Sequence, residues 1–215
     1  MHRSSLLRME YFVKNYLLRS STARMKLKIL DVGSCDVNGT YKDLFPEELF
    51  EYQGLDMAPG SNVDIVPEFP YDWSEIETNS FDVVVSGQAF EHIEFFWLTF
   101  AEMTRVLRHG GLMAVVAPHG FGYHRYPVDC YRFYADGLVA LAKYANMIPL
   151  HASTNAAPLG APPQWYSQQE DDSFMIAKKP LSAEDYVIDK RKYKPVVTDM
   201  ETLLTGFVTR GEQNY

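Results

Sequence analysis

The chain has 215 residues, of which 47% are hydrophobic and 22% charged, so it can fold around one hydrophobic core. This composition excludes a disordered or collagen-like chain, and two cysteines are too few for a disulfide-stabilised miniprotein. No apolar run is long enough to predict a membrane helix, and charged residues interrupt the N-terminal apolar stretch that a signal peptide would need. We therefore expect a cytoplasmic protein with reduced cysteines.

The charge is distributed unevenly along the chain. Residues 1–28 hold seven basic side chains and one acidic side chain, whereas residues 31–102 hold 16 acidic side chains and one basic side chain. A surface this acidic repels a phosphate backbone, so general nucleic-acid binding is not expected. The basic N-terminal stretch can contact an anionic partner, although a solvated amphipathic helix is the simpler explanation.

The spacing of apolar residues predicts the secondary structure. Helical periods occur at residues 6–17, 90–107 and 136–146. Short apolar runs with the length of buried strands occur at residues 27–32, 52–57, 81–86, 112–117, 148–154 and 173–178. We expect His109-Gly110-Gly111 to end the second helix, and a proline- and glycine-rich loop to join the last two strands.

The alternation of strands and helices predicts an α/β fold with a mostly parallel sheet covered on both faces. Only a few residues separate the second strand from a candidate strand at 63–66, too few for the usual crossover between parallel strands. The helix after the second strand is therefore expected to be missing. We divide the chain into an N-terminal helix acting as a lid or cap (1–25), a main domain (26–180) and a tail packed on that domain (181–215).

Ligands of parallel sheets bind beside the carboxyl ends of the strands. The first predicted strand ends in Asp31-Val-Gly33, where glycine lets a ligand approach the backbone, and Asn38-Gly39 tolerates a second sharp bend. The second strand ends at Asp56. An acidic residue roughly 20 positions after such a glycine can accept hydrogen bonds from both hydroxyls of a ribose. Alone, these features are typical of many nucleotide-binding proteins.

A longer series of motifs narrows this interpretation. It comprises Asp31-Val-Gly33, Asp56, Phe81-Asp-Val-Val-Val-Ser86, Glu91-His92-Ile93 and Arg105-Val-Leu-Arg-His-Gly-Gly111. In order and spacing, residues 27–120 resemble the class I S-adenosylmethionine-dependent methyltransferases of the type-11 kind. The resemblance implies a Rossmann-like sheet of seven strands, mostly parallel, that ends in an antiparallel pair formed by the two late strands. It also implies S-adenosyl-L-methionine as the cofactor and methyl transfer as the activity.

The resemblance assigns cofactor contacts to matching positions. The loop after the first strand would surround the methionine part of the cofactor, and the end of the second strand would bind the ribose. The segment near residue 72 would contact the adenine, and the segment near residue 87 would contact the sulfonium. The residues so implied are Asp31, Gly33, Ser34, Cys35, Asn38, Gly39, Asp56, Met57, Asp72, Trp73, Gly87 and Gln88.

Asp72 and the loop after the first strand each have a second interpretation. Asp72 reads equally well as a turn residue. The family's usual GxGxG has also become Gly33-x5-Gly39, which implies a wider loop in which the side chains of Asp36 or Asn38 can replace backbone contacts.

An unusual polar and aromatic segment follows the strand at 112–117. Residues 117–133 include two of the six histidines, four tyrosine or phenylalanine rings before Phe133, and an Asp/Arg pair. The segment resembles one found in methyltransferases that accompany cell-surface glycan and sugar biosynthesis. This resemblance implies a saccharide or glycan hydroxyl as the acceptor. A different small metabolite, a protein acceptor, and a non-catalytic cofactor-binding domain remain as alternatives.

Methylation of a hydroxyl requires removal of its proton, and a histidine with an ordinary pKa of about 6.5 can accept one at neutral pH. We expect His124 to be this base, with His119 and then Asp129 as the alternatives. The residues expected at the substrate are His92, Tyr126 and Arg132. Asp129 and Arg132 can instead simply pair to fasten the loop. The histidines and Asp129 match no recognised ligand spacing, so no metal is expected.

Overall fold

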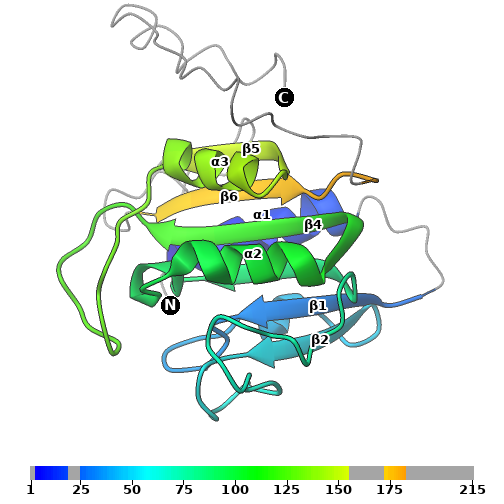
Figure 1. Cartoon of the computed structure of the whole chain (residues 1–215), viewed down its shortest axis with the longest axis horizontal. Coiled ribbons are helices and arrows are strands. Elements are labelled where there is room, and N and C mark those ends of the chain that lie inside the picture. Colours follow the sequence, from blue (N-terminus) through cyan, green and yellow to red (C-terminus); the bar gives the residue numbers. More distant parts are fainter. Residues whose placement is uncertain (1–2, 19–24, 155–171, 183–215) are drawn as a thin grey trace, which may run out of the picture.

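The computed structural model describes residues 3–18, 25–154 and 172–182, and this part of the chain contains one six-stranded sheet (Figure 1). The strands are β1 (Leu27–Val32), β2 (Phe50–Leu55), β3 (Phe81–Gly87), β4 (Leu107–Pro118), β5 (Ile148–Thr154) and β6 (Asp172–Lys178). Their order is β2-β1-β3-β4-β6-β5, with β1 to β4 parallel and β6 antiparallel to both β4 and β5. This arrangement confirms the predicted Rossmann-like sheet and its antiparallel ending.

The number of strands in the described residues is six, so the predicted seven are not confirmed. The candidate strand at 63–66 forms only one parallel bridge, between Ile65 and Leu55. The Asp64 carboxylate accepts a hydrogen bond from the Gly54 amide at 2.8 Å, which folds the segment back against the end of β2. Residues 56–80 contain no helix, as predicted from the short link after the second strand.

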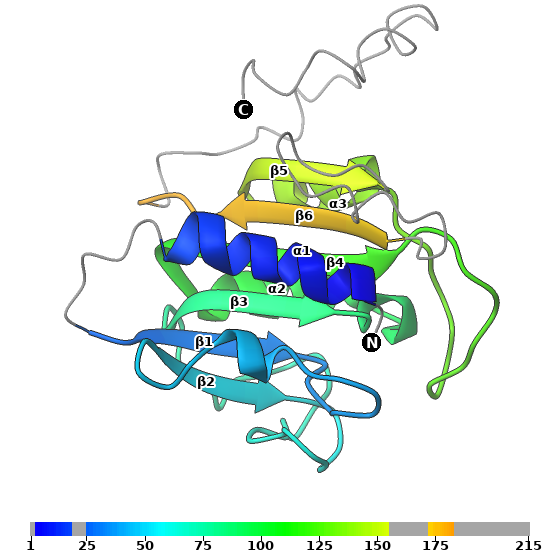
Figure 2. The same cartoon turned by 180° about the vertical axis from the view of Figure 1, so that it is seen from behind.

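Helices cover both faces of the sheet. α2 (Phe96–Val106) and α3 (Ala135–Tyr144) lie on one face (Figure 1). α1 (Arg3–Phe12), continued by a π-helical turn at Val13–Leu17, lies along the other face (Figure 2). Two 3-10 turns, at Lys42–Leu44 and Phe90–His92, complete the described helical structure.

The predicted helix at 90–107 is divided, and its end differs from the prediction. A 3-10 turn precedes α2, which ends at Val106 and passes directly into β4. His109-Gly110-Gly111 therefore lies within the start of β4 and does not cap the helix. There the pairing with β3 is irregular between Phe81 and Val83, and Gly110 has a φ of +77° that accommodates the irregularity.

The two faces of the sheet bury separate hydrophobic clusters. Along β3, Val84 packs into the cluster beneath α2 and α3, whereas Val83 and Val85 pack into the cluster beneath α1. The central strands therefore read as continuous apolar runs, since both of their faces are buried.

α1 is a packing layer of the fold. Met9 and Phe12 have no exposed surface and lie in the same cluster as the valines of β3. The helix predicted as a lid or cap thus covers a face of the sheet, because its apolar side can be buried there. The predicted loop at 156–163 and the tail after residue 182 lie outside the described residues. None of the described helices is both long and apolar enough to cross a membrane.

Candidate active site

A cavity of about 890 Å³ lies at the carboxyl ends of β1, β2 and β3. Eleven of the predicted cofactor residues line it: Asp31, Gly33, Ser34, Cys35, Asn38, Gly39, Asp56, Met57, Trp73, Gly87 and Gln88. Three predicted acceptor-side residues line it as well: His92, His124 and Tyr126. The predicted residues that do not line it are Asp72, His119, Asp129 and Arg132. No residue of α1 lines it either, so the helix is not placed as a lid over this cavity.

Two glycines allow the backbone to pass close to its surroundings at the cavity. Gly33 has a φ of +78°, and a Cβ there would lie 2.4 Å from the Cβ of Ala89. A Cβ on Gly87 would lie 1.8 Å from the hydroxyl oxygen of Tyr41, a side chain with no exposed surface. Any larger residue at either position would have to displace the loop or the ring.

Asp31 places a buried carboxylate at the end of β1. Its Oδ2 accepts a hydrogen bond of 2.5 Å from the Tyr52 hydroxyl, whereas its Oδ1 is buried without a hydrogen-bond partner in the described part of the chain. Burial raises the pKa of Asp31 to about 7, the Tyr52 hydrogen bond lowers it, and the charge of Asp56 raises it. A buried carboxylate with an unmatched oxygen fits the ammonium group of a methionine moiety.

Asp56 organises the backbone at the end of β2. Its Oδ2 accepts a hydrogen bond from the Cys35 amide at 3.1 Å, and its Oδ1 accepts one from the Met57 amide at 2.7 Å. A carboxylate oxygen has two acceptor positions, so each oxygen can also accept a hydrogen bond from a ribose hydroxyl.

Side chains help to hold the loop after β1. The Asp36 carboxylate accepts a hydrogen bond from the Gly39 amide at 2.8 Å. Asn62, at a φ of 67°, reaches the loop with its side-chain amide, which lies 3.1 Å from the Ser34 carbonyl and 3.0 Å from the Tyr52 hydroxyl. Sequence reasoning did not identify Asn62 or Tyr52, because nothing in the local pattern connects them with this loop.

The predicted adenine pair, Asp72 and Trp73, is separated by the structure. Trp73 is 1% exposed and lines the cavity, and its indole donates a hydrogen bond to the Pro70 carbonyl at 3.2 Å. Asp72 is exposed and accepts a hydrogen bond from the Ser74 amide at 3.1 Å, so it acts here as a turn residue. Only Trp73 is placed to contact a ligand in the cavity.

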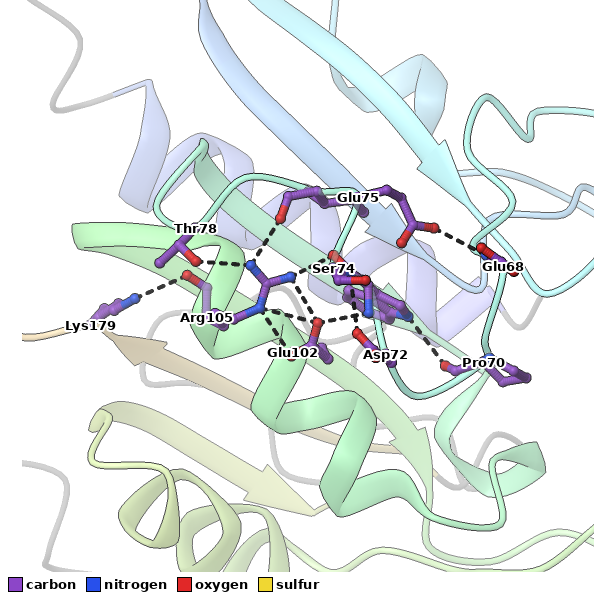
Figure 3. A network of polar contacts seen from close by, with 11 residues as sticks. Glu68, Pro70, Asp72, Ser74, Glu75, Thr78, Glu102, Arg105 and Lys179 are labelled. Carbon is purple, nitrogen blue, oxygen red and sulfur yellow. Dashed lines mark hydrogen bonds and ion pairs between the residues drawn. The ribbon is translucent and has the colours of Figure 1, made fainter.

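Arg105 fixes this segment from α2 (Figure 3). Its guanidinium donates to the Trp73 carbonyl at 2.7 Å and to the Ile76 carbonyl at 2.9 Å, and it pairs with Glu102 at 2.8 Å. The hydrogen bonds that Arg105 donates to the Glu102 carboxylate raise the pKa of Arg105 above its ordinary value. Arg105, the first residue of the predicted Arg105–Gly111 motif, therefore holds the Trp73 segment against α2.

Asp129 and Arg132 fasten the loop after β4. Arg132 donates two hydrogen bonds to the Asp129 carboxylate, at 2.5 and 2.8 Å, and a third to the Gly122 carbonyl at 3.1 Å. These contacts hold the pKa of Asp129 below its ordinary value, and they leave it poorly suited to accept a proton. Asp129 also accepts a hydrogen bond of 2.7 Å from the backbone amide of His124, which positions that residue.

The predicted bases lie in different surroundings. His124 lines the cavity, and its Nδ1 lies 3.0 Å from the Gly122 carbonyl and 3.8 Å from Asp129. The longer distance is too great for a hydrogen bond, so Gly122 and not Asp129 orients the ring. His119 lies outside the cavity, with its ring 5.6 Å from that of Tyr134.

Glu91 and His92, on the 3-10 turn after β3, meet His124 at one side of the cavity. The rings of His92 and His124 are nearly perpendicular, with centroids 5.0 Å apart. His92 Nε2 lies 3.6 Å from Glu91 Oε1, and its Nδ1 lies 2.6 Å from the Val128 carbonyl. Burial lowers the pKa of His92, so this ring is neutral at neutral pH. The residue that sequence reasoning left out of this group is Glu91, which has no exposed surface.

Comparisons with known proteins agree with this geometry. Residues 30–115 match the family model of the methyltransferase domain. Among solved structures, the carbon methyltransferase CurJ has a TM-score of 0.60 at 10% identity, over 81% of this chain and 54% of that chain. The chain thus spans about half the length of the CurJ protein. No curated protein matches the sequence.

Two further structures cover most of both chains. The 1,6-didemethyltoxoflavin N1-methyltransferase of Burkholderia thailandensis, solved with 1,6-didemethyltoxoflavin and S-adenosylhomocysteine, has a TM-score of 0.57 at 16% identity, over 83% of this chain and 80% of that chain. The [4+2]-cyclase SpnF has a TM-score of 0.55 at 15% identity, over 83% of this chain and 81% of that chain. At these identities the likeness concerns the fold alone. The chain therefore has the fold of class I methyltransferases, and residues 30–115 match a methyltransferase domain.

Proposed function

We propose that the protein methylates a hydroxyl group on a saccharide or a similar polyhydroxylated small molecule. The observation that carries this proposal is the shared cavity. Its β1–β3 side presents the two carboxylates suited to the cofactor, and its other side presents His92, His124 and Tyr126. A bound cofactor and an acceptor can therefore meet without a further opening in the fold.

S-adenosylmethionine supplies a methyl group already activated by a positive sulfur, so the chain's residues have to bind, orient and deprotonate. Asp31 suits the ammonium group, Asp56 the ribose hydroxyls, and Trp73 the adenine. These three side chains come from separate segments, and each is held by hydrogen bonds to the protein. Such fixed placement is what an in-line displacement requires, because misalignment of the reacting atoms raises the barrier steeply.

The acceptor side supports a polar substrate with flat apolar faces. Phe121 and Tyr126 line the cavity and are 55% and 60% exposed, so a sugar can reach part of each ring and stack on it. The adjacent histidines offer ring nitrogens to hydroxyl groups.

Among the three predicted bases, His124 is the one that we propose acts on the acceptor hydroxyl. Asp129 is already engaged by Arg132, and His119 lies outside the cavity. Because a carbonyl only accepts, Nδ1 of His124 donates to the Gly122 carbonyl, and Nε2 is the ring nitrogen left to take the proton of the acceptor.

A methyl-transfer assay tests this function. The purified protein and S-adenosylmethionine are incubated with a panel of monosaccharides, oligosaccharides, amines and carbon acids, and release of S-adenosylhomocysteine is measured. Release that depends on a hydroxylated acceptor, with Tyr126→Ala raising KM more than it lowers kcat, supports the proposal. Release only with amines or carbon acids contradicts it.

The second candidate is methylation of another small metabolite or of a protein. Similar structures include proteins named as carbon and nitrogen methyltransferases, so the fold accepts other methyl acceptors. A similar structure is named as a [4+2]-cyclase, so the fold is not restricted to methyl transfer. The third function is therefore a domain that binds the cofactor without catalysis. Cofactor binding with no release of S-adenosylhomocysteine for any acceptor class would favour that third function.

A further inference from the structure

Glu91, His92 and His124 form a compact group of metal-ligand types at the acceptor side of the cavity. One carboxylate oxygen of Glu91 and one nitrogen of each ring all lie within 4.8 Å of one another. Two residues come from the turn after β3, and the third comes from the loop after β4, more than 30 residues later in the chain. The fold therefore brings the group together, which explains why sequence spacing did not reveal it.

Hydrogen bonds fix both histidine rings in the form that a metal ion requires. Nδ1 of His92 lies 2.6 Å from the Val128 carbonyl, and Nδ1 of His124 lies 3.0 Å from the Gly122 carbonyl. A carbonyl only accepts, so each Nδ1 carries the proton and each Nε2 keeps its lone pair in the neutral ring. Histidines that bind metals usually donate their other N–H to a carbonyl or carboxylate in this way.

The carboxylate supplies the charge that two neutral rings lack. Glu91 has no exposed surface, and its Oε1 lies 3.6 Å from Nε2 of His92. One carboxylate and two imidazoles form a ligand set with a single negative charge, which suits a divalent cation.

We propose that Glu91, His92 and His124 bind one divalent transition-metal ion. Two imidazoles and a carboxylate favour ions such as Zn²⁺, Co²⁺ or Ni²⁺ over Mg²⁺, which prefers oxygen ligands. Two ligands about 2.1 Å from one ion lie about 3–4 Å apart, so small side-chain rotations close the present spacing. This site goes beyond the proposed function and does not depend on the identity of the acceptor.

The position of the site gives the ion a role toward the acceptor. Three protein ligands leave coordination positions open, and all three residues line the cavity. Hydroxyl oxygens of an acceptor can occupy those positions, which would fix the acceptor beside the cofactor. With the ion bound, Nε2 of His124 would be a ligand and could not act as the base. The ion would instead lower the pKa of the coordinated acceptor hydroxyl, and its proton would pass to solvent water.

Cobalt binding to the metal-free full-length protein tests the site directly, since bound Co²⁺ absorbs visible light. We expect one Co²⁺ per chain, displaced by Zn²⁺ but not by an equal concentration of Mg²⁺. His92→Ala, His124→Ala and Glu91→Gln should each weaken binding at least about tenfold. His109→Ala serves as the control, because His109 is exposed on β4 away from the cavity and should leave binding unchanged.

Two results would overturn the site: no saturable Co²⁺ binding by the wild type, or binding that both His124→Ala and the control leave unchanged. Glu91→Gln alters a buried residue and can disturb folding. The decision therefore rests on His124→Ala, because His124 is a loop residue that is only partly buried. S-adenosylhomocysteine binding is measured on the same samples. If the wild type binds the cofactor product but not cobalt, the metal site alone is refuted. If the wild type does not bind the cofactor product, the proposed function is refuted.

Discussion

The two sides of the cavity are built in different ways. The cofactor side rests on the ends of β1, β2 and β3, and its residues are tied into the sheet and to the layer beneath α1. The acceptor side consists of a 3-10 turn and the loop after β4, joined by the Cys130 amide, which donates to the Glu91 carbonyl at 2.7 Å. Several of its side chains are largely exposed, including Phe121, Tyr123 and Tyr126.

This difference matches the demands of the two ligands. S-adenosylmethionine is the same molecule in every enzyme that uses it, so a rigid site formed by strand ends suits it. Acceptors vary, and a loop fastened by a few side-chain contacts can vary with them while the sheet stays unchanged. Substitutions that disturb packing should therefore affect the cofactor side most. Substitutions that remove single polar groups should affect the acceptor side most.

The largest expected effect comes from the packing behind the cofactor side. Phe12→Ala removes a fully buried ring from the cluster that also holds Tyr41 and should lower the free energy of unfolding by about 3–5 kcal/mol. Tyr126→Ala, in the exposed loop, should change it by less than about 0.5 kcal/mol. Denaturant unfolding followed by circular dichroism checks both values. Equal effects of the two variants would remove the contrast between the two sides.

The next effect separates chemistry from cofactor binding. His124→Ala should lower turnover by about 100-fold or more, because the acceptor hydroxyl loses the group that acts on it. The affinity for S-adenosylmethionine should stay within about threefold of wild type, since the cofactor carboxylates are untouched. Steady-state kinetics and calorimetry measure the two quantities. Near-normal turnover would exclude both roles that we assign to His124.

Asp56→Ala should have the opposite profile. Loss of the carboxylate removes acceptors for two ribose hydroxyls and for the Cys35 and Met57 amides, so cofactor affinity should fall by roughly 2 kcal/mol, about 30-fold. Asp43→Ala is the matched control, because Asp43 is an exposed carboxylate on the 3-10 turn at Lys42–Leu44 and does not line the cavity. Calorimetry measures the cofactor affinity of both variants. An equal loss of affinity in Asp43→Ala would indicate a general charge effect and contradict a specific role of Asp56.

The smallest effect is a pH dependence of cofactor binding. With a pKa of about 7, Asp31 is mostly protonated at pH 6, and it must lose that proton to face the ammonium group of the cofactor. Affinity should therefore rise about tenfold between pH 6 and pH 8 and level off above the pKa. Asp31→Asn should bind more weakly and lose this dependence. A wild-type affinity that is constant over this range would show that Asp31 does not meet the ammonium group.

Much of the fold could be predicted because the strands are short apolar runs whose length and spacing are visible in the sequence. β1 and β5 have the predicted bounds, and the antiparallel ending follows the predicted pair. The seventh strand was not predictable in the same way, because whether 63–66 joins the sheet depends on the Asp64 contact with Gly54. The position of α1 was also open, since an amphipathic pattern does not reveal which surface will cover it.

The candidate site shows the same division. Strand-end residues such as Asp31 and Asp56 could be placed because strand ends converge at one edge of the sheet. Asp72 and His119 were misplaced in relation to the cavity, because sequence proximity does not fix which way a turn or loop side chain points. Glu91 joins His92 and His124 only through tertiary folding, so no local spacing could have indicated that group.

The central claim is that the strand-end side of the cavity binds S-adenosylmethionine and leaves the other side for an acceptor. Isothermal calorimetry of the wild-type protein with S-adenosylmethionine, S-adenosylhomocysteine and NADH tests it most directly. We expect one molecule of either sulfur compound to bind per chain with a micromolar Kd, and NADH not to bind. Micromolar binding of NADH without binding of S-adenosylmethionine would contradict the account.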